Sequence, residues 1–425
     1  MKANLIIHNA GQLLTCAPGG SPKRGLAMTD VGVIDDGSVA INGGKIVGVG
    51  RSQDIARQFQ AATIIDVEGK VVTPGFVDCH THIVYAGDRL NEFELKIKGA
   101  DYLEILEKGG GIISTVKHTR EARLDELVKQ GLKRLDKMLA CGTTTAEIKT
   151  GYGLDTATEM KMLVAIAELD IIHAIDIVPT FLAAHAVPPE FKGNAEAYVD
   201  LICGEMLPMA WDWYVGSHFF AKKTPFFADV FCEKNAFSLD QSERILRTAK
   251  ALWFGIKAHV DEFTNLGGSR LGIGIGAVSI DHLDAISDEE VKLLAKSDTI
   301  GIVTPTVNFN FGSTNFADAR KLIDSGCAVA VSTDFNPGSA PCPSIPNAMA
   351  IACRYQKMLP AEAMNAATIN AAFAIGLGDR LGSIEVGKQA DVLIFDTKDY
   401  RQIAYEFGVN MIGTVIKNGV EIRRL

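Results

Sequence analysis

The chain has 425 residues, of which 47% are hydrophobic and 22% are charged, so it can bury a large core and is not an intrinsically disordered protein. Its formal net charge of −9 excludes a general electrostatic attraction to nucleic acid or anionic lipid. The first apolar run is too short for a signal peptide or a membrane span, and the 8 cysteines form no CxxC pair, so we expect a cytoplasmic protein with reduced thiols.

The two ends of the chain both contain patterns that predict short β-strands. Residues 1–70 contain short strands and glycine-bearing hairpins, such as SVAINGGKIVGVG from Ser38. Residues 381–425 contain ADVLIFD from Ala390 and MIGTVIKNGVEI from Met411, which also predict short strands. We therefore predict that both chain ends together build one small flanking β-sandwich domain. The central domain lies between them in the sequence and spans residues 71–380.

In the central domain, eight apolar and β-branched runs alternate with amphipathic helical stretches, which is typical of parallel strands joined by crossover helices. The runs are VVTPGFVDCH from Val71, TTTAEIKTGY from Thr143, IDIVPTFLAAH from Ile175, ADVFCE from Ala228, GIKAHVDE from Gly255, VSIDHL from Val278, TIGIVTP from Thr299 and VAVSTDF from Val329. Eight parallel strands close a barrel. The predicted fold class is therefore α/β, a (β/α)8 TIM-like barrel over residues 71–380.

Several local patterns predict where the helices of this barrel begin and end. Capping boxes are expected at Ser238 with Gln241 and at Ser287 with Glu290. Left-handed residues at helix C-termini are expected at Gly142, Gly255 and Gly326. The run LGIGIGA from Leu271 imitates a dinucleotide-binding fingerprint, but it lacks the preceding strand and the later acidic residue, so we interpret it as a loop between the fifth and sixth strands.

The strongest chemical signal is the pair of histidines in DCHTH at the end of the first strand. Side chains alternate along a strand, so His80 and His82 point the same way, into the barrel mouth. Imidazole is a ligand for borderline divalent metals such as zinc and ferrous iron. On its own, an HxH pair is a weak signal for a metal site.

Three more polar residues occupy the carboxyl ends of later strands. His259 is on the fifth strand, His282 on the sixth and Asp334 on the eighth. Each one alone is better explained as a buried core histidine or a helix-capping aspartate. Together they favour an active site, because barrel enzymes place their catalytic residues at this face.

In sequence order, these residues resemble the amidohydrolase superfamily, in its branch with a single metal. The resemblance lies in PGFVDCHTH, the HxxE from His259 to Glu262, the strand-six histidine, STDFNPG and GSIEVGKQADVLIFD. Within the superfamily the chain is most similar to the imidazolonepropionase family, through Gly87-Asp88-Arg89 with Glu92-Phe93, GGGI from Gly109, KTGYG from Lys149, FLAAH from Phe181 and DFNPGS from Asp334.

The resemblance implies one divalent metal ion, zinc or iron, held by His80, His82, His259 and Asp334. It implies metal-dependent hydrolysis of the ring amide of 4-imidazolone-5-propanoate to N-formimidoyl-L-glutamate, a step of histidine degradation. Two-metal relatives bridge their ions with a carboxylated lysine, and neither Lys149 nor Glu233 matches that position, so a single ion is expected.

The resemblance also implies the catalytic residues. His282 is the general base, and Asp334 shares the proton. Glu262 binds the ring N–H and helps carry a proton to the leaving nitrogen. His185 contacts the ring carbonyl, which it polarises or whose oxyanion it stabilises.

An anionic substrate needs a local cation in an acidic protein, and Arg89 offers the bidentate fork that a carboxylate matches. The alternative for Arg89 is a surface salt bridge with Glu92 or Glu94. The other substrate-binding residues that the resemblance implies are Tyr102, Tyr152, His185, Glu262, Asn336, Gly338 and Ser339. The tyrosines could instead be amphipathic core residues, and Asn336, Gly338 and Ser339 could simply form a turn.

Two other functions remain open from the sequence. An aminohydrolase that deaminates a heterocycle would use the same barrel, but most such substrates carry no carboxylate for Arg89. A catalytically inactive binding relative would have no physical need for so much buried charge. The expected partner is a small anionic substrate, without nucleic acid or membrane. A homodimer is compatible with the sequence, which leaves the oligomeric state and the choice of zinc, iron or manganese open.

Overall fold

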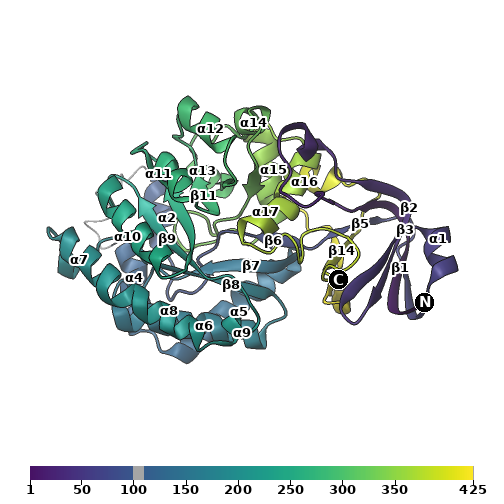
Figure 1. Ribbon diagram of the computed structural model, residues 1–425, viewed down its shortest axis with the longest axis horizontal. Helices are drawn as coiled ribbons and strands as arrows, with labels where there is room; N and C mark the ends of the chain where they lie inside the picture. Colours follow the sequence, from purple (N-terminus) through teal and green to yellow (C-terminus); the bar gives the residue numbers. More distant parts are fainter. Residues whose placement is uncertain (99–109, 425) are drawn as a thin grey trace.

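Two sheets organise the chain, and the computed structural model describes them over residues 1–98 and 110–424. Figure 1 shows the barrel at one end of the molecule and the flanking sheet, which holds both termini, at the other. Among the described residues, no helix is long and apolar enough to cross a membrane.

The barrel consists of eight parallel strands that follow one another in sequence order, which confirms the predicted fold class. The strands are β6 (Phe76–Asp78), β7 (Thr143–Lys149), β8 (Asp176–Ala184), β9 (Phe227–Cys232), β10 (Gly255–Val260), β11 (Ser279–His282), β12 (Ile300–Val303) and β13 (Val329–Val331). Beyond β6 and β13 the chain closes the barrel, because the amide of His82 donates to the carbonyl of Phe335 at 2.9 Å. The carboxyl ends of the first and last strands therefore meet.

Helices surround the barrel strands (Figure 1). They are α2 (Leu90–Ile97), α4 (Ile112–Glu121), α5 (Leu124–Ala140), α6 (Thr156–Ile172), α7 (Ala195–Leu201), α8 (Leu207–Val215), α9 (His218–Ala221), α10 (Leu239–Ala251), α11 (Gly268–Ile275), α12 (Asp288–Leu294), α13 (Pro305–Phe311), α14 (Ala319–Asp324), α15 (Ile345–Tyr355), α16 (Pro360–Ala366) and α17 (Ile369–Ala374). Both predicted capping boxes are confirmed, at the starts of α10 and α12. The helices pack their apolar faces against the barrel strands and so cover the outer face of the parallel sheet, as such a sheet requires.

The flanking domain is one mixed sheet of eight strands built from both ends of the chain. Its strands are β1 (Lys2–Leu14), β2 (Val33–Asn42), β3 (Lys45–Arg51), β4 (Gln60–Asp66), β5 (Val71–Pro74), β14 (Val392–Phe395), β15 (Ile412–Lys417) and β16 (Val420–Arg424), with the short helices α1 (Ser52–Gln58) and α18 (Gln402–Tyr405). The long β1 pairs with β2, β4 and β5, and β5 pairs on its other side with β14. Residues from the two chain ends, such as Ile7 and Ile416, share one apolar core.

The run that begins at Val71 was expected to be one barrel strand, and this expectation is wrong. Val71–Pro74 is β5 of the flanking sheet, and only Phe76–Asp78 is β6 of the barrel. Gly75 separates them, and a Cβ there would lie 2.2 Å from the hydroxyl oxygen of Thr144. Both halves are buried, so their apolar pattern does not distinguish the two sheets.

Two predictions about glycines are also corrected. Gly142 and Gly326 have the expected left-handed φ of 89°, but Gly255 opens β10, and Trp253 (φ 71°) is the left-handed residue instead. A glycine is required at position 255 for close packing instead, because a Cβ there would lie 2.5 Å from the ring of Phe227. The LGIGIGA run is not a loop: most of it lies in α11, with left-handed Gly276 ending the helix.

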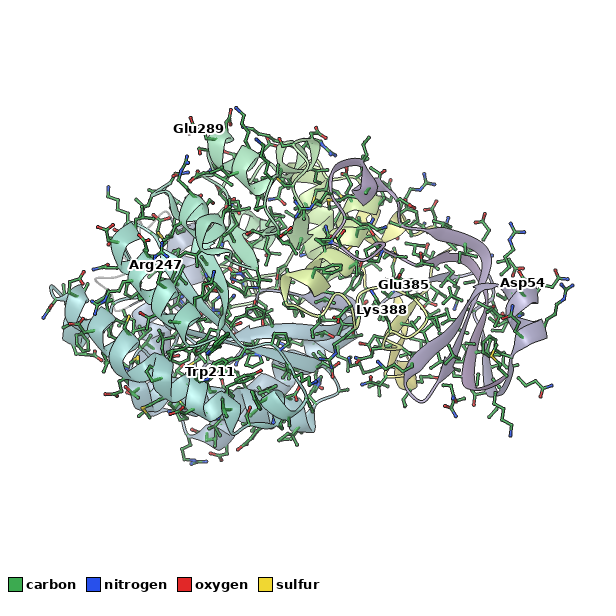
Figure 2. The ribbon with its side chains drawn as sticks, viewed as in Figure 1. Asp54, Trp211, Arg247, Glu289, Glu385 and Lys388 are labelled. Carbon is green, nitrogen blue, oxygen red and sulfur yellow. The ribbon has the colours of Figure 1, made fainter. Side chains whose placement is uncertain are left out.

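A buried ion cluster ties the flanking sheet to the barrel. The Nζ atom of Lys417, in β15, lies 2.7 Å from a carboxylate oxygen of Asp176 and 2.7 Å from one of Asp391. Nearby in the linking segment, Glu385 and Lys388 form an ion pair of 2.9 Å (Figure 2). Asp176 is the first residue of β8, so the flanking domain is attached at the end of the barrel opposite the carboxyl ends of the strands.

Candidate metal centre and active site

Five of the nine histidines gather where the barrel strands end: His80, His82, His185, His259 and His282. The ring centroids of His80 and His259 are 4.4 Å apart, and those of His82 and His185 are 5.0 Å apart in a stacked pair. The five come from four separate segments of the barrel. The fold therefore brings together side chains that are up to two hundred residues apart in the sequence.

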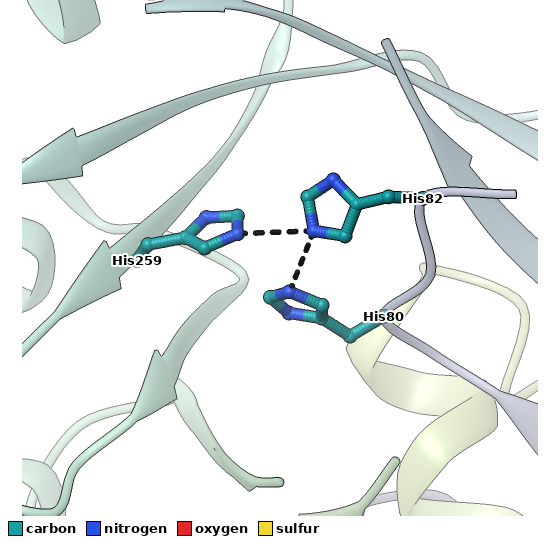
Figure 3. Close-up of side chains that lie close together, drawn as sticks. All are labelled: His80, His82 and His259. Atoms are coloured by element: carbon teal, nitrogen blue, oxygen red, sulfur yellow. Dashed lines mark hydrogen bonds between the residues drawn. The ribbon is translucent and has the colours of Figure 1, made fainter. Parts of the chain in front are cut away.

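The four predicted metal ligands lie close together at the barrel mouth. The Nε2 atom of His82 is 3.3 Å from that of His80 and 3.4 Å from that of His259, and Figure 3 shows the three rings pointing toward one another. Asp334 Oδ1 lies 3.5 Å from His80 Nε2 and 3.4 Å from His82 Nε2. Three nitrogens and one carboxylate oxygen form a donor set that suits zinc or ferrous iron.

The hydrogen bonds around the cluster fit a bound cation. His80 Nδ1 lies 2.6 Å from Asp281 Oδ2, and His259 Nδ1 lies 3.0 Å from Asp229 Oδ2. The Asp281 carboxylate accepts a hydrogen bond from His80 Nδ1, so this nitrogen carries the ring hydrogen and the His80 Nε2 lone pair faces the cluster. His259 Nδ1 and Asp229 are in ion-pair contact without hydrogen-bond geometry. Asp334 Oδ1 is buried there with no hydrogen-bond partner among the described residues. Burial raises the pKa of Asp334 well above its usual range, so a cation is needed to stabilise the carboxylate.

His282 lies between this cluster and Glu262. Its Nδ1 is 3.0 Å from the hydroxyl of Thr304, and its Nε2 is 3.9 Å from Glu262 Oε2. Burial lowers the pKa of His282 well below that of an ordinary histidine, and burial raises the pKa of Glu262 well above that of an ordinary glutamate. The pair is suited to proton transfer, with an unprotonated imidazole beside a carboxyl group that holds its proton.

The backbone is strained where these residues are displayed. His282, Leu283 and Asp334 have φ values of 84°, 69° and 48°, and Asp261, beside Glu262, has 54°. Non-glycine residues rarely occupy this region, at a cost of about 1–3 kcal/mol each, and such residues cluster at active sites. Four of the thirteen such residues described in this chain lie at the carboxyl ends of β10, β11 and β13.

His185 has a defined tautomer. Its Nδ1 lies 3.0 Å from the carbonyl oxygen of Gly151, which can only accept, so Nδ1 is the donor. Burial lowers the pKa of His185 to about 3, so the ring is neutral and its Nε2 is an acceptor. Gly151 (φ 106°) cannot be replaced easily, since a Cβ there would lie 2.8 Å from the His185 ring.

Tyr152 is held beside His185 by a residue that the sequence did not indicate, Glu159. The Tyr152 ring is buried, 5.4 Å from that of His185 and 6.0 Å from that of His82. The buried carboxylate of Glu159, in the first turn of α6, accepts from the backbone amides of three loop residues, Gly151, Gly153 and Leu154. It thereby fixes the loop that carries Tyr152.

Arg89 is a partly buried residue rather than a surface one. Its Nε donates to Glu92 at 2.9 Å, and Glu92 also accepts from the amide of Gly111 at 2.8 Å. The guanidinium lies flat against Gly338, where a Cβ would be 2.1 Å from Nη1. Glu92 thus occupies the Nε side of the guanidinium, and its terminal nitrogens donate no hydrogen bond to any described residue, so they are available to a carboxylate.

The remaining predicted substrate residues have different outcomes. Tyr102 lies outside the described residues. Asn336 stabilises a turn: its side-chain oxygen accepts from the amides of Gly338 and Ser339, each at 2.8 Å, and its Nδ2 donates to the carbonyl of Asp334. This turn follows the metal-binding aspartate directly and presents Gly338 to Arg89.

A buried charge network below the metal ligands was not predicted. Glu147 and Lys149 are on β7, Asp229 on β9, Lys257 on β10 and Asp281 on β11, and all five are buried. Burial alone would lower the pKa of Lys149, but the charges of Asp229, Glu147 and Asp281 raise it above its ordinary value, so the lysine is cationic. The signal in the sequence was the presence of charged residues at alternate positions of otherwise apolar strands.

Comparisons with known proteins agree on the fold and on the relatives. A model of the amidohydrolase family matches residues 265–422. An imidazolonepropionase of Chloroflexus aggregans is 53% identical over 416 residues, which covers 98% of this chain and 97% of that protein. One from Herpetosiphon aurantiacus is 50% identical over 422 residues, with 99% and 98% covered. The solved structure of an adenosine deaminase from Xanthomonas campestris with bound zinc has a TM-score of 0.71 at 20% identity, over 99% of this chain and 93% of that chain, and shows the fold alone.

Proposed function

The chain belongs to the imidazolonepropionase family of the amidohydrolases, and we propose that its barrel site hydrolyses the ring amide of 4-imidazolone-5-propanoate to N-formimidoyl-L-glutamate. The observation that carries the proposal is the cluster of His80, His82 and His259 at the barrel mouth. Asp334 Oδ1 lies 3.4 Å from His82 Nε2, and His282, which lies 3.9 Å from Glu262, forms a second group with His80 and Asp334. The buried location excludes bulk water, which strengthens electrostatic contacts to a small polar substrate.

We propose a single ion, zinc or iron, held by His80, His82, His259 and Asp334. When bound, a divalent ion would supply hydrolytic chemistry by lowering the pKa of a coordinated water to about 7. Neither of the two candidates for a bridging ligand, Lys149 and Glu233, supports a second ion. Lys149 is enclosed by carboxylates, and Glu233 accepts from the amides of Phe263 and Thr264.

The residues around the ligands then have distinct functions in the proposal. His282 Nε2, which has no partner among the described residues, takes the proton of the attacking water. Glu262, protonated by its burial, delivers a proton to the leaving nitrogen. The tautomer of His185 gives it an acceptor toward the site, so we assign it a substrate ring N–H instead of the donation to the ring carbonyl that the family resemblance suggested.

A direct assay tests the substrate. The purified protein, loaded with zinc or iron, should remove the ultraviolet absorbance of imidazolone propionate and release N-formimidoyl-L-glutamate. Ammonia release from purines or pyrimidines, measured in parallel, tests deamination. A metal-loaded protein that leaves imidazolone propionate intact but deaminates a heterocycle would replace the proposed function with the aminohydrolase alternative.

Arg89→Met should lower kcat/KM for imidazolone propionate by about 30- to 5000-fold. Loss of a buried charge-assisted contact to a carboxylate costs about 2 to 5 kcal/mol, which converts to that range. The metal content should not change, because Arg89 contacts Glu92 and Gly338 and none of the proposed ligands. An analogue without the carboxylate should be a poor substrate that the mutation hardly affects. Equal losses for both substrates would show that Arg89 supports the loop and does not bind the carboxylate.

Gly338→Ala should reproduce part of this defect without changing any charge. The added methyl would overlap the guanidinium of Arg89 and force it to move. A displacement of about 1 Å can cost up to about 100-fold in rate, so we expect kcat/KM to fall by about 10- to 100-fold. Gly274→Ala is the control, since its Cβ meets nothing within 4 Å. Normal kinetics of the Gly338 variant would mean that Arg89 does not need its observed position.

A further inference from the structure

The charge network below the metal ligands has Lys149 as its central member. Its five side chains, Glu147, Lys149, Asp229, Lys257 and Asp281, are each at most 2% exposed. Lys257 binds Glu147 at 3.1 Å and the carbonyl of Cys79 at 3.0 Å, and its Nζ lies 3.9 Å from Asp281 Oδ2. Lys149 lies among Glu147, Asp229 and Asp281.

Lys149 shares its carboxylate partners with two metal-binding histidines. Its Nζ lies 2.7 Å from Asp229 Oδ2, and the same oxygen lies 3.0 Å from His259 Nδ1. The Nζ also lies 3.7 Å from Asp281 Oδ2, and that oxygen lies 2.6 Å from His80 Nδ1. One ammonium group thus stands between the two carboxylates behind His80 and His259, which come from opposite parts of the barrel sequence.

We propose that Lys149 is a positioning residue of the metal centre: it holds Asp229 and Asp281 in place, and through them it aims the Nε2 atoms of His259 and His80 at the ion. The inference rests on the metal site of the proposed function. It does not depend on the identity of the substrate.

The physical reason is the cost of burying like charges together. Asp229 and Asp281 have lost their hydration. Without Lys149, Asp229 loses the ammonium at 2.7 Å and Asp281 keeps Lys257 at the longer distance of 3.9 Å, so the two carboxylates repel each other. A rearrangement that separates them would also move the imidazoles to which they are joined. Loss of partners behind a metal-binding histidine typically weakens metal affinity by about 10- to 100-fold.

The test is the dissociation constant of Zn²⁺, measured on the metal-free full-length protein by competition with a chromogenic chelator. Lys149→Met keeps the length of the side chain and removes its charge. We expect the dissociation constant to rise by about 10- to 100-fold. The visible spectrum of the Co²⁺-loaded variant should also differ from that of the wild type, because it reports the geometry of the ligands.

Lys417→Met is the matched control. Lys417 is equally a buried lysine between two carboxylates, Asp176 and Asp391, but it lies at the junction with the flanking sheet. Its loss should reduce thermal stability and leave the Zn²⁺ dissociation constant and the Co²⁺ spectrum unchanged. A general effect of removing a buried lysine would instead appear in both variants.

A double variant, Lys149→Met with Asp229→Asn, keeps the test decisive if the single variant does not fold. It removes one charge of each sign, and the amide oxygen still faces His259. We expect a dissociation constant between those of the wild type and the single variant. Wild-type Zn²⁺ affinity in the folded single variant would overturn the proposal. If the single variant does not fold, wild-type affinity in the double variant would overturn it. An equal rise of the Zn²⁺ dissociation constant in Lys417→Met would also overturn it. Tight Zn²⁺ binding by a wild-type protein that does not hydrolyse imidazolone propionate would overturn the substrate and not this inference.

Discussion

His80→Ala should abolish both hydrolysis and metal retention, because it removes a ligand that lies within 3.5 Å of two other donors. His80 Nε2 lies 3.3 Å from His82 Nε2 and 3.5 Å from Asp334 Oδ1, so it contributes to both halves of the donor set. The fold should persist, since Asp281 keeps Lys149 and Lys257 at 3.7 Å and 3.9 Å after the imidazole is lost. The measurements are the metal content after gel filtration, the melting temperature and kcat.

The control for this variant is His218→Ala. His218 lies in α9, on the outside of the barrel, where it binds Asp170 at 2.8 Å. It should retain one metal ion per chain and normal turnover. Unfolding of His80→Ala, compared with a folded metal-free wild type, would show that His80 holds the barrel together rather than an ion. A second stoichiometric ion in the wild type would contradict the mononuclear site.

His282→Ala should lower kcat by about 10²- to 10⁴-fold, the usual contribution of a positioned general base, while the protein keeps its metal. The acidic limb of the kcat/KM profile should flatten in the variant, because the wild type loses activity as His282 gains a proton. Since burial lowers the pKa of His282, that limb should lie on the acidic side of an ordinary histidine titration.

Metal analysis of the same variant separates two interpretations of His282. Its ring nitrogen lies near enough to His80 and Asp334 to complete an alternative three-residue ion site. Loss of the ion from His282→Ala would make His282 a ligand. A metal-loaded variant with near-normal turnover would remove His282 from the chemistry altogether.

The candidate ligands could be grouped from the sequence because their signal is local. Alternation along one strand places His80 and His82 on the same side, and the order of the strands places His259, His282 and Asp334 at the same end. The fold class followed from the same strand order. None of these inferences needs the position of a side chain in space.

The features of the fold and of the site that the sequence could not predict depend on contacts between distant segments. The apolar run from Val71 is buried in either sheet, so its pattern could not show that β5 leaves the barrel. The LGIGIGA run forms a helix that packs closely on β11, since a Cβ on Gly272 would lie 2.6 Å from the side chain of Ile280. Lys149 resembles a lone strand-end residue until β9 and β11 supply its two carboxylates.

The position of β5 has a consequence for how the protein is made. This strand lies between β1 and β14, so its second edge remains bare until residues 392–395 have been synthesised. The metal-binding pair follows only a few residues after β5, and pairings between distant segments form slowly. The anchoring of His80 and His82 is therefore a late event in biogenesis, and ribosome-bound chains that end before β14 should expose an unpaired strand edge, which is a site for aggregation.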